Sequence, residues 1–217
     1  MVTRLTSDQY NDPITGSMPN IIPSVQFAAP IHCHDYYEFF LITKGSVLHI
    51  VNNDIQRLTE GALVFVRPDD IHCYDYDGNS DCEFLNIPFA APMIEEAFAY
   101  LGEAFDSRRL IKAKMPPFTF ILSWAKERLL NLVSRIQMAS MNDKTHARVI
   151  LKGLLIEIFT QYFSESSPGA DSSIPVWLEN LMIEMHKKEK FIEGITAMYD
   201  LASCTPGHLN KVFKKYF

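Results

Sequence analysis

The sequence predicts a mainly β N-terminal half, folded as a barrel or sandwich, followed by α-helices. Between residues 37 and 89, short runs of aromatic and β-branched residues alternate with turn sequences at residues 52–54 and 77–80. After Pro92 the apolar residues recur about every three to four positions, which is the period of a helix. The change of period marks the border between the two regions.

Short strands separated by turns are expected throughout the N-terminal half. They are predicted at residues 25–29, 37–43, 47–51, 55–58, 62–66, 71–76 and 82–89. The rest of the lead-in over residues 1–30 is rich in Pro, Gly and Asn, which favours irregular structure. Because the strands are short and closely spaced, we expect them to close into a small barrel.

Helical periodicity continues through the second half. Helices are predicted over residues 93–102, 118–137 and 144–163, and again from Pro175 to about Lys190. The Ser-rich run over residues 164–173 predicts a flexible linker. The expected domains are a barrel over residues 1–92, a helical packing or dimerisation region over 93–163, the linker over 164–173, and a C-terminal helical domain over 174–217.

Composition limits the kinds of protein that the chain can be. Its 217 residues carry a formal charge of −6, with 47% hydrophobic and 21% charged residues, which suits a globular protein with a full core. No apolar run approaches the ~18 residues of a membrane span, and residues 1–10 lack the apolar region of a secretory signal. The four cysteines show no paired spacing, which predicts free thiols and a cytoplasmic location.

The sharpest chemical signal lies at residues 31–45. His32 and His34 are two positions apart, so both side chains face the same side of a strand, and Glu38 has the same parity. His72, further along the chain, offers another imidazole. Three imidazoles and one carboxylate suit Zn, Ni, Fe or Mn, so these four residues are the predicted ligands of a divalent transition metal.

These residues resemble the signature of the cupins, a family of small β-barrels. The first cupin motif is matched by His32, His34, Glu38 and Gly45, and the spacing of the second by Gly61 and His72. The chain departs from the motifs at turn and framework positions, which here hold Gln26, Arg67, Asp69 and Tyr76. The resemblance implies a barrel with the predicted metal ligands inside it.

Residues 195–217 predict a helix-turn-helix unit. A short helix over residues 195–201 is followed by a tight turn, and Thr205 and Pro206 are suited to begin a second helix. Leu209, Val212, Phe213 and Tyr216 form its apolar stripe. The residues predicted to contact DNA are Thr205, His208, Asn210, Lys211, Lys214 and Lys215.

This segment is similar to the start of the DNA-binding domain of AraC-type bacterial transcription regulators. The residues that carry the resemblance are Ala197, Leu201, Ser203, Leu209, Lys211, Phe213 and Lys214. That family places a cupin-like sensor barrel and two commonly dimerising helices before this domain, so the resemblance covers nearly the whole chain and implies a homodimer. Residues 34–39 and 175–178 further resemble regulators of chitobiose-type operons.

The C-terminal domain is expected to be incomplete. The DNA-binding domain of the family contains two helix-turn-helix units, whereas this sequence stops at Phe217, at the end of the first. A domain as small as residues 174–217 is marginal on its own. Either the sequence is a fragment, or the natural product is truncated and is expected to bind DNA weakly.

Three functions remain open from the sequence. The first is a transcription regulator of a carbohydrate-use operon, with a sugar or related effector, and a divalent metal, in the barrel. The second is a metal-dependent cupin enzyme, an isomerase or dioxygenase. The third is a sensor-only dimer that titrates full-length partners. Because an enzyme does not need residues 197–217, we favour the regulator and predict no enzymatic activity.

The occupant of the barrel also has two alternatives. Many sensor barrels of the AraC type have lost the metal and bind an organic effector instead. In that case the residues that would hydrogen-bond a sugar hydroxyl are His32, His34, Glu38 and His72. Arg67 and Tyr37 are further candidates for contacting such a ligand.

Overall fold

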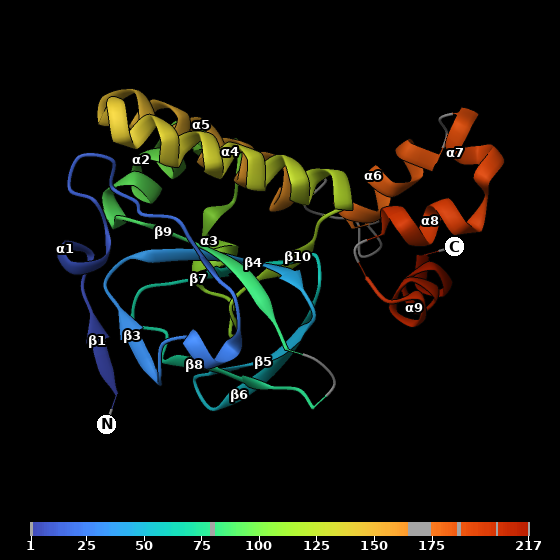
Figure 1. Ribbon diagram of the computed structural model, residues 1–217, viewed down its shortest axis with the longest axis horizontal. Helices are drawn as coiled ribbons and strands as arrows, with labels where there is room; N and C mark the ends of the chain where they lie inside the picture. Colours follow the sequence, from blue (N-terminus) through green and yellow to red (C-terminus); the bar gives the residue numbers. More distant parts are fainter. Residues whose placement is uncertain (1, 79–80, 165–174, 186–187, 203, 217) are drawn as a thin grey trace.

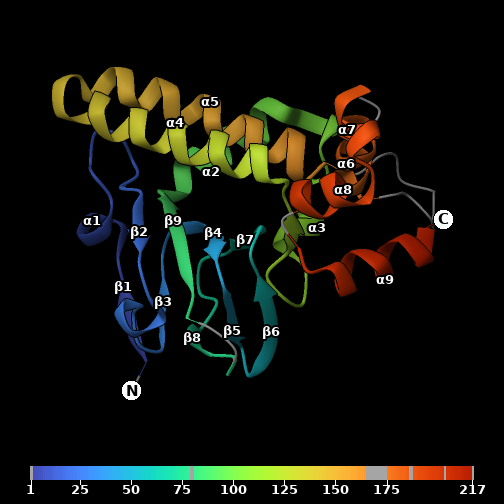
Figure 2. The same cartoon turned by 45° about the vertical axis from the view of Figure 1, so that its right-hand side comes forward.

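The computed structural model describes residues 2–78, 81–164, 175–185, 188–202 and 204–216. A β domain lies beneath a layer that contains two long helices, and the C-terminal helices lie at one end of that layer (Figure 1). The turned view shows the same C-terminal helices on one side of the molecule (Figure 2). The predicted linker over residues 164–173 lies outside the described residues, apart from Ser164.

In the described part of the chain the strands form two five-stranded sheets. The first sheet has the order β1 (Thr3–Leu5), β3 (His32–His34), β8 (His72–Tyr76), β5 (Ser46–Val51) and β6 (Asp54–Thr59). The second has the order β10 (Phe118–Phe120), β7 (Ala62–Val66), β4 (Tyr37–Lys44), β9 (Glu83–Phe89) and β2 (Asn20–Ile22). Side chains of both sheets meet in one core, so the predicted β barrel followed by helices is confirmed.

The lead-in segment differs from its prediction. Residues 25–29 do not form a strand: Val25–Phe27 is a short 3-10 helix (η1), and the Ser24 hydroxyl accepts a hydrogen bond from the backbone N–H of Gln26. Instead, β1 pairs with β3 and β2 pairs with β9, at the edges of the two sheets. Both short strands depend on distant partners, which a local apolar pattern does not reveal.

Strands β4, β7 and β9 are buried on both faces. Phe40 and Val64 point into the barrel, where they join a core that also contains Val47 of the opposite sheet. Phe39 and Phe65 point the other way, and their ring centroids lie 4.8 Å apart in the core shared with the helices. This double burial explains why the strands are almost continuously apolar in sequence.

Helices α2 (Ala91–Leu101), α4 (Ser123–Asn142) and α5 (Lys144–Tyr162) cover the outer face of the second sheet (Figure 1). The first long helix begins at Ser123 rather than at residue 118, because residues 118–120 pair with β7 as β10. Asp143 joins α4 to α5, and its side chain accepts a hydrogen bond from the backbone N–H of His146. The remaining helical elements of this half are α1 (Ser7–Tyr10), η2 (Gly102–Ala104) and α3 (Ser107–Ile111).

The C-terminal unit consists of α6 (Val176–Met185), α7 (Lys188–Glu193), α8 (Ile195–Leu201) and α9 (Pro206–Tyr216). The Thr205 hydroxyl accepts a hydrogen bond of 3.3 Å from the backbone N–H of His208 and so caps α9. The apolar core of the unit contains Leu122, which precedes α4. Phe120 of β10 packs against this core and also against the core of the barrel. The unit therefore shares side chains with the β domain.

The cysteines carry free thiols, as predicted, at positions 33, 73, 82 and 204. Cys82 lies in the barrel core, where burial raises the pKa of its thiol to about 12. That thiol therefore stays protonated at neutral pH. None of the described helices is both long and apolar enough to cross a bilayer.

Candidate metal and ligand site

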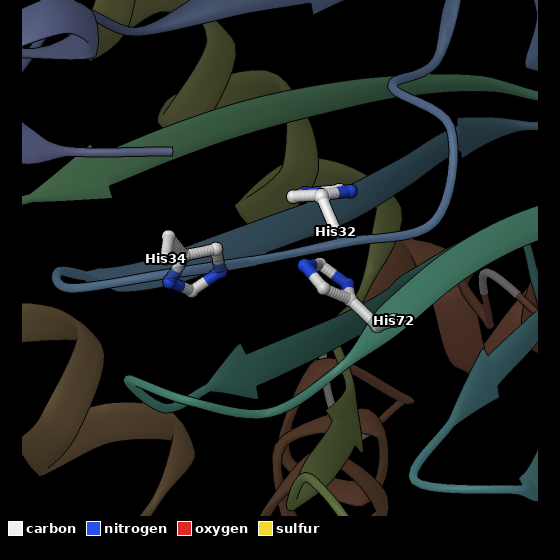
Figure 3. A group of neighbouring side chains, drawn as sticks. All are labelled: His32, His34 and His72. Carbon is white, nitrogen blue, oxygen red and sulfur yellow. The ribbon is translucent and has the colours of Figure 1, made fainter. Parts of the chain in front are cut away.

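Of the four predicted metal ligands, the structure brings three histidines together. His32 on β3 is directly paired with His72 on β8, and His34 lies two residues further along β3. One ring nitrogen of each histidine lies within 4.8 Å of those of the other two. Figure 3 shows the three imidazoles around a common space. All three side chains are buried, which places the cluster inside the barrel.

The hydrogen bonds of two of these histidines fix which ring nitrogen carries the proton. Nδ1 of His32 lies 2.7 Å from the carbonyl oxygen of Pro30, and Nδ1 of His34 lies 2.6 Å from that of Tyr36. A carbonyl oxygen can only accept a hydrogen bond, so Nδ1 carries the hydrogen in both rings. Each Nε2 therefore holds a lone pair, which is the state of a metal-ligating nitrogen.

The third histidine is oriented by another histidine. Nδ1 of His72 lies 3.1 Å from Nε2 of His49, which lies on β5. Nε2 of His34 and Nε2 of His72 are buried, and neither has a hydrogen-bond partner among the residues that the structure describes. Leaving a buried polar atom unpaired costs about 1–3 kcal/mol, and an ion between the histidines would remove that cost. The donor set therefore fits a divalent transition metal.

Burial keeps the imidazoles neutral. It lowers the pKa of His34 and of His49 to about 4, and it lowers the pKa of His72 well below the ordinary value. The pKa of His32 is lowered by the same cause. At neutral pH all four rings are uncharged, and a neutral imidazole is the form that binds a metal.

Glu38 approaches the histidines from the opposite sheet. It lies on β4 and not on an extension of β3, so the sequence argument that placed it on one strand with His34 is wrong. Its Oε2 is nevertheless 4.0 Å from Nε2 of His34, while its Oε1 accepts a hydrogen bond of 3.1 Å from the hydroxyl of Tyr74. Asn86 donates a second hydrogen bond to the carboxyl group. Burial raises the pKa of Glu38 to about 7.

A pocket of about 250 Å³ opens beside His32 and Glu38. Aromatic side chains, among them Tyr36 and Tyr74, line it together with Asn86, and residues 5–29 form its other wall. Larger hollows of about 470 and 520 Å³ lie outside the barrel and contain none of the predicted ligands. The small pocket combines aromatic walls with a few convergent polar groups, which is the usual character of a site for a small organic molecule.

Two predicted ligand contacts, Arg67 and Tyr37, lie away from this pocket. Nε of Arg67 is 2.8 Å from Oδ2 of Asp70 in a buried ion pair, and Nη1 donates to the carbonyl groups of residues 110, 111 and 113. Tyr37 lies on the opposite face of β4 from Glu38, with its ring stacked on Phe65 at 5.4 Å between centroids. The guanidinium of Arg67 is already paired with the buried carboxylate of Asp70. The side chain of Tyr37 points toward the helices and not into the barrel. The structure therefore places neither side chain where it was predicted to act.

His49 and Asn86 also belong to this site, although neither was predicted from the sequence. His49 has the same parity as Val47 and Val51, which are buried, and this alternation was a usable signal. It was obscured because the intervening residues of β5 are also apolar. Asn86 lies in the apolar strand β9, where nothing nearby in sequence indicates that it meets a carboxyl group.

The residues predicted to contact DNA lie on α9 and at its start. The exposed ones are Thr205, Asn210, Lys211, Lys214 and Lys215. His208 instead packs inward. Its ring centroid lies 4.8 Å from that of Phe120 on β10 and 6.3 Å from that of Trp177 on α6. Burial lowers the pKa of His208. The exposed face of α9 is thus basic, and the structure does not place His208 on it.

Comparison with known sequences identifies the family of the N-terminal part of the chain. The sequence profile of the AraC-like ligand binding domain matches residues 23–159. The HTH-type transcriptional activator RhaS of Yersinia pseudotuberculosis (serotype I, strain IP32953) is 34% identical over 163 residues, which are 71% of this chain and 58% of that protein. RhaS of Yersinia pestis (strain Pestoides F) is 34% identical over 77 residues, 36% of this chain and 26% of that protein. This chain thus spans little more than half the length of the first of these relatives.

A solved structure supports the fold. Apo ToxT K231A from Vibrio cholerae strain SCE256 has a TM-score of 0.50 at 11% sequence identity, over 95% of this chain and 77% of that one. At this identity the likeness shows a shared fold. The two RhaS relatives are transcriptional activators by name, in agreement with the prediction that this chain is not an enzyme. By the match over most of its length, the chain belongs to the family of AraC-like ligand binding domains.

Proposed function

We propose that this chain regulates transcription in response to a small molecule held in its barrel. The observation that carries the proposal is that one chain contains both parts. A pocket opens onto His32 and Glu38, and a helix-turn-helix with an exposed basic face packs against the same β domain. The effector that we propose is a sugar or a related molecule, because hydroxyl groups suit the polar groups of this pocket and its aromatic walls suit a sugar ring.

We further propose that the barrel holds a divalent transition metal. His32, His34 and His72 would bind it through Nε2, with Glu38 as the nearby carboxylate. When bound, the ion supplies a Lewis-acidic centre that attracts a hydroxyl or carboxylate oxygen of the effector. The protein's own part is to hold three neutral imidazoles in place beside the pocket.

The route from effector to DNA that we propose passes through shared packing. Residues 5–29 form one wall of the pocket, and Tyr74 and Phe84 form another. Tyr74 and Phe84 belong to the barrel core against which Phe120 packs, and Phe120 in turn contacts His208 at the start of α9. An effector that binds one arrangement of these side chains more tightly shifts the protein toward it.

Elemental analysis of the purified, untagged chain tests the metal. The wild-type protein is expected to carry a near-stoichiometric transition metal, and a His32→Ala/His34→Ala variant is expected to lose it, because only His72 of the cluster remains. His146→Ala is the matched control, since His146 is exposed on α5. Absence of metal from the wild-type protein would exclude the metal and leave the four residues as the polar lining of an organic-ligand pocket.

DNA binding is tested by fluorescence anisotropy with a short random-sequence duplex. Three phosphate contacts predict a slope of log K against log salt of about −2.7, from about −0.9 per neutralised phosphate. A Lys211→Gln/Lys214→Gln/Lys215→Gln variant is expected to lose most of both the affinity and the slope. Equal binding by this variant and the wild-type chain would rule out α9 as the DNA-contacting element.

A further inference from the structure

A chain of hydrogen bonds lies behind His72 and outside the candidate ligand set. Nδ1 of His72 contacts Nε2 of His49 at 3.1 Å, and Nδ1 of His49 contacts Oε1 of Gln56 at 3.0 Å. Nε2 of Gln56 then donates to the carbonyl oxygen of Pro116 at 2.8 Å. We propose that His49 and Gln56 are positioning residues that hold His72 in the tautomer whose Nε2 faces the metal. The inference rests on the proposed metal site.

The direction of each hydrogen bond follows from the far end of the chain. The Pro116 carbonyl can only accept, so the amide nitrogen of Gln56 faces it and the amide oxygen faces His49. An amide oxygen also only accepts, so Nδ1 of His49 carries the hydrogen. Because His49 is fully buried and neutral, its Nε2 is then an acceptor and Nδ1 of His72 must donate. This leaves a lone pair on Nε2 of His72, the atom that has no other partner among the described residues.

The hydrogen bonds from His72 through His49 and Gln56 to Pro116 form a relay. His72 needs this relay because the partner of its Nδ1 is of a different kind from the partners of the other two histidines. His32 and His34 each donate from Nδ1 to a carbonyl group two residues away in their own segment. The Nδ1 partner of His72 is instead a side chain on the neighbouring strand β5. A side-chain partner can change tautomer, so its own orientation must be fixed for the metal-facing nitrogen to be fixed.

Packing holds the relay in place. The ring of His49 is stacked on Tyr74 at 5.3 Å between centroids and meets the ring of Phe40 edge-on at 5.0 Å. At the other end, the residue after Pro116 is tied to the second sheet, since the Pro117 carbonyl accepts a hydrogen bond of 2.9 Å from the backbone N–H of Phe65. The relay therefore joins β5 and β6 of the first sheet to the segment that enters β10.

Two variants remove the relay in different ways. His49→Phe preserves an aromatic ring but offers no acceptor to His72, and Gln56→Leu removes the acceptor that fixes His49. His49→Gln is the conservative variant, because its amide can accept from His72 and donate to Gln56. His146→Phe, at an exposed position, is the matched control. If His49→Phe fails to fold, the half-buried Gln56→Leu variant still decides the question.

Two measurements on the full chain test the proposal. Long-range ¹H–¹⁵N NMR of the metal-free protein at neutral pH is expected to show the proton of His72 on Nδ1, and mixed tautomers in His49→Phe and Gln56→Leu. Zn²⁺ affinity, measured by competition with a chelator, is expected to fall about 10- to 100-fold in both variants and to recover in His49→Gln. A merely structural role would not change the tautomer of His72 in a folded variant.

The two possible failures are distinguishable. If wild-type protein binds Zn²⁺ and both variants bind it equally tightly with His72 unchanged, the relay is overturned and the metal site stands. If the wild-type protein binds no Zn²⁺, the metal site itself is excluded and the proposed role of the relay falls with it.

Discussion

Arg67→Met is expected to lower the free energy of unfolding by about 3–5 kcal/mol, the usual cost of breaking a buried ion pair from one side. Arg67 and Asp70 are both buried, and the guanidinium donates two hydrogen bonds to the carboxylate, of 2.8 Å from Nε and 3.0 Å from Nη2. The same guanidinium holds the end of α3 and the residues after it through three carbonyl groups. Its loss leaves the three carbonyl groups unpaired and leaves the buried carboxylate without a counter-charge, with only the Asn52 amide and the backbone N–H of residue 67 still donating to it. Urea unfolding followed by circular dichroism measures the change.

Two further variants identify the cause. Arg4→Met removes an ion pair with Asp69 that is largely exposed, and it should change stability far less because water screens that pair. Arg67→Met/Asp70→Leu removes both buried charges and should recover much of the loss, since no unpaired charge remains. If Arg67→Met were no more destabilising than Arg4→Met, the buried ion pair would not hold α3 against the β domain.

The metal-free protein is expected to lose stability as the pH falls from about 7 to about 5. The pKa of His34 and of His49 lies near 4 in the folded protein, against an ordinary value of 6.5. Within this window the unfolded chain binds protons that the folded chain does not, so stability present above pH 6.5 is lost as the pH falls toward 4. Between pH 7 and pH 5, each of these two lowered pKa values reduces the free energy of unfolding by about 2 kcal/mol. The lowered pKa values of His32 and His72 act in the same direction.

Glu38 opposes this loss. Its pKa is raised from 4.5 to about 7, so in the same window the folded protein binds the proton more tightly than the unfolded chain does. This offsets about 2 kcal/mol of the histidine effect. Urea unfolding in the presence of a chelator should therefore show a net loss in the wild-type protein and a steeper one in Glu38→Gln. His146→Gln is the control for an exposed histidine, and stability that is equal or greater at the lower pH would contradict the interpretation.

The sequence predicts the parts of the site that depend on neighbouring residues, and it misses those that depend on contacts between distant segments. His32 and His34 share a face because strand alternation is a local property, and cupin-like spacing placed His72 beside them. Glu38 reaches the cluster for another reason: it comes from the opposite sheet, across the barrel. The paired partner of Arg67 lies only three residues away, but its burial depends on α3 folding over it, and no local pattern contains that information.

The fold divides in the same way. The strands with strong local patterns, β4 to β9, lie close to where alternation and turn residues predict them. The short edge strands β1, β2 and β10 have almost no pattern of their own and exist through pairing with strands far away in sequence. The predicted helix over residues 118–137 therefore began too early. Its first apolar residues fit a helical period but pair with β7 as strand β10.

The place of Phe120 between two cores has a consequence for how the molecule comes apart. Local opening of a protein is cheap where an element has its own small core and expensive where it must also expose the core of its neighbour. The C-terminal helices pack on Leu122 and Phe120, and Phe120 is also part of the barrel's packing. Their detachment therefore uncovers apolar surface on the β domain, so amide exchange in α9 should slow when a molecule binds in the barrel. The protection of those amides is thus a gauge of pocket occupancy that requires no knowledge of the DNA sequence.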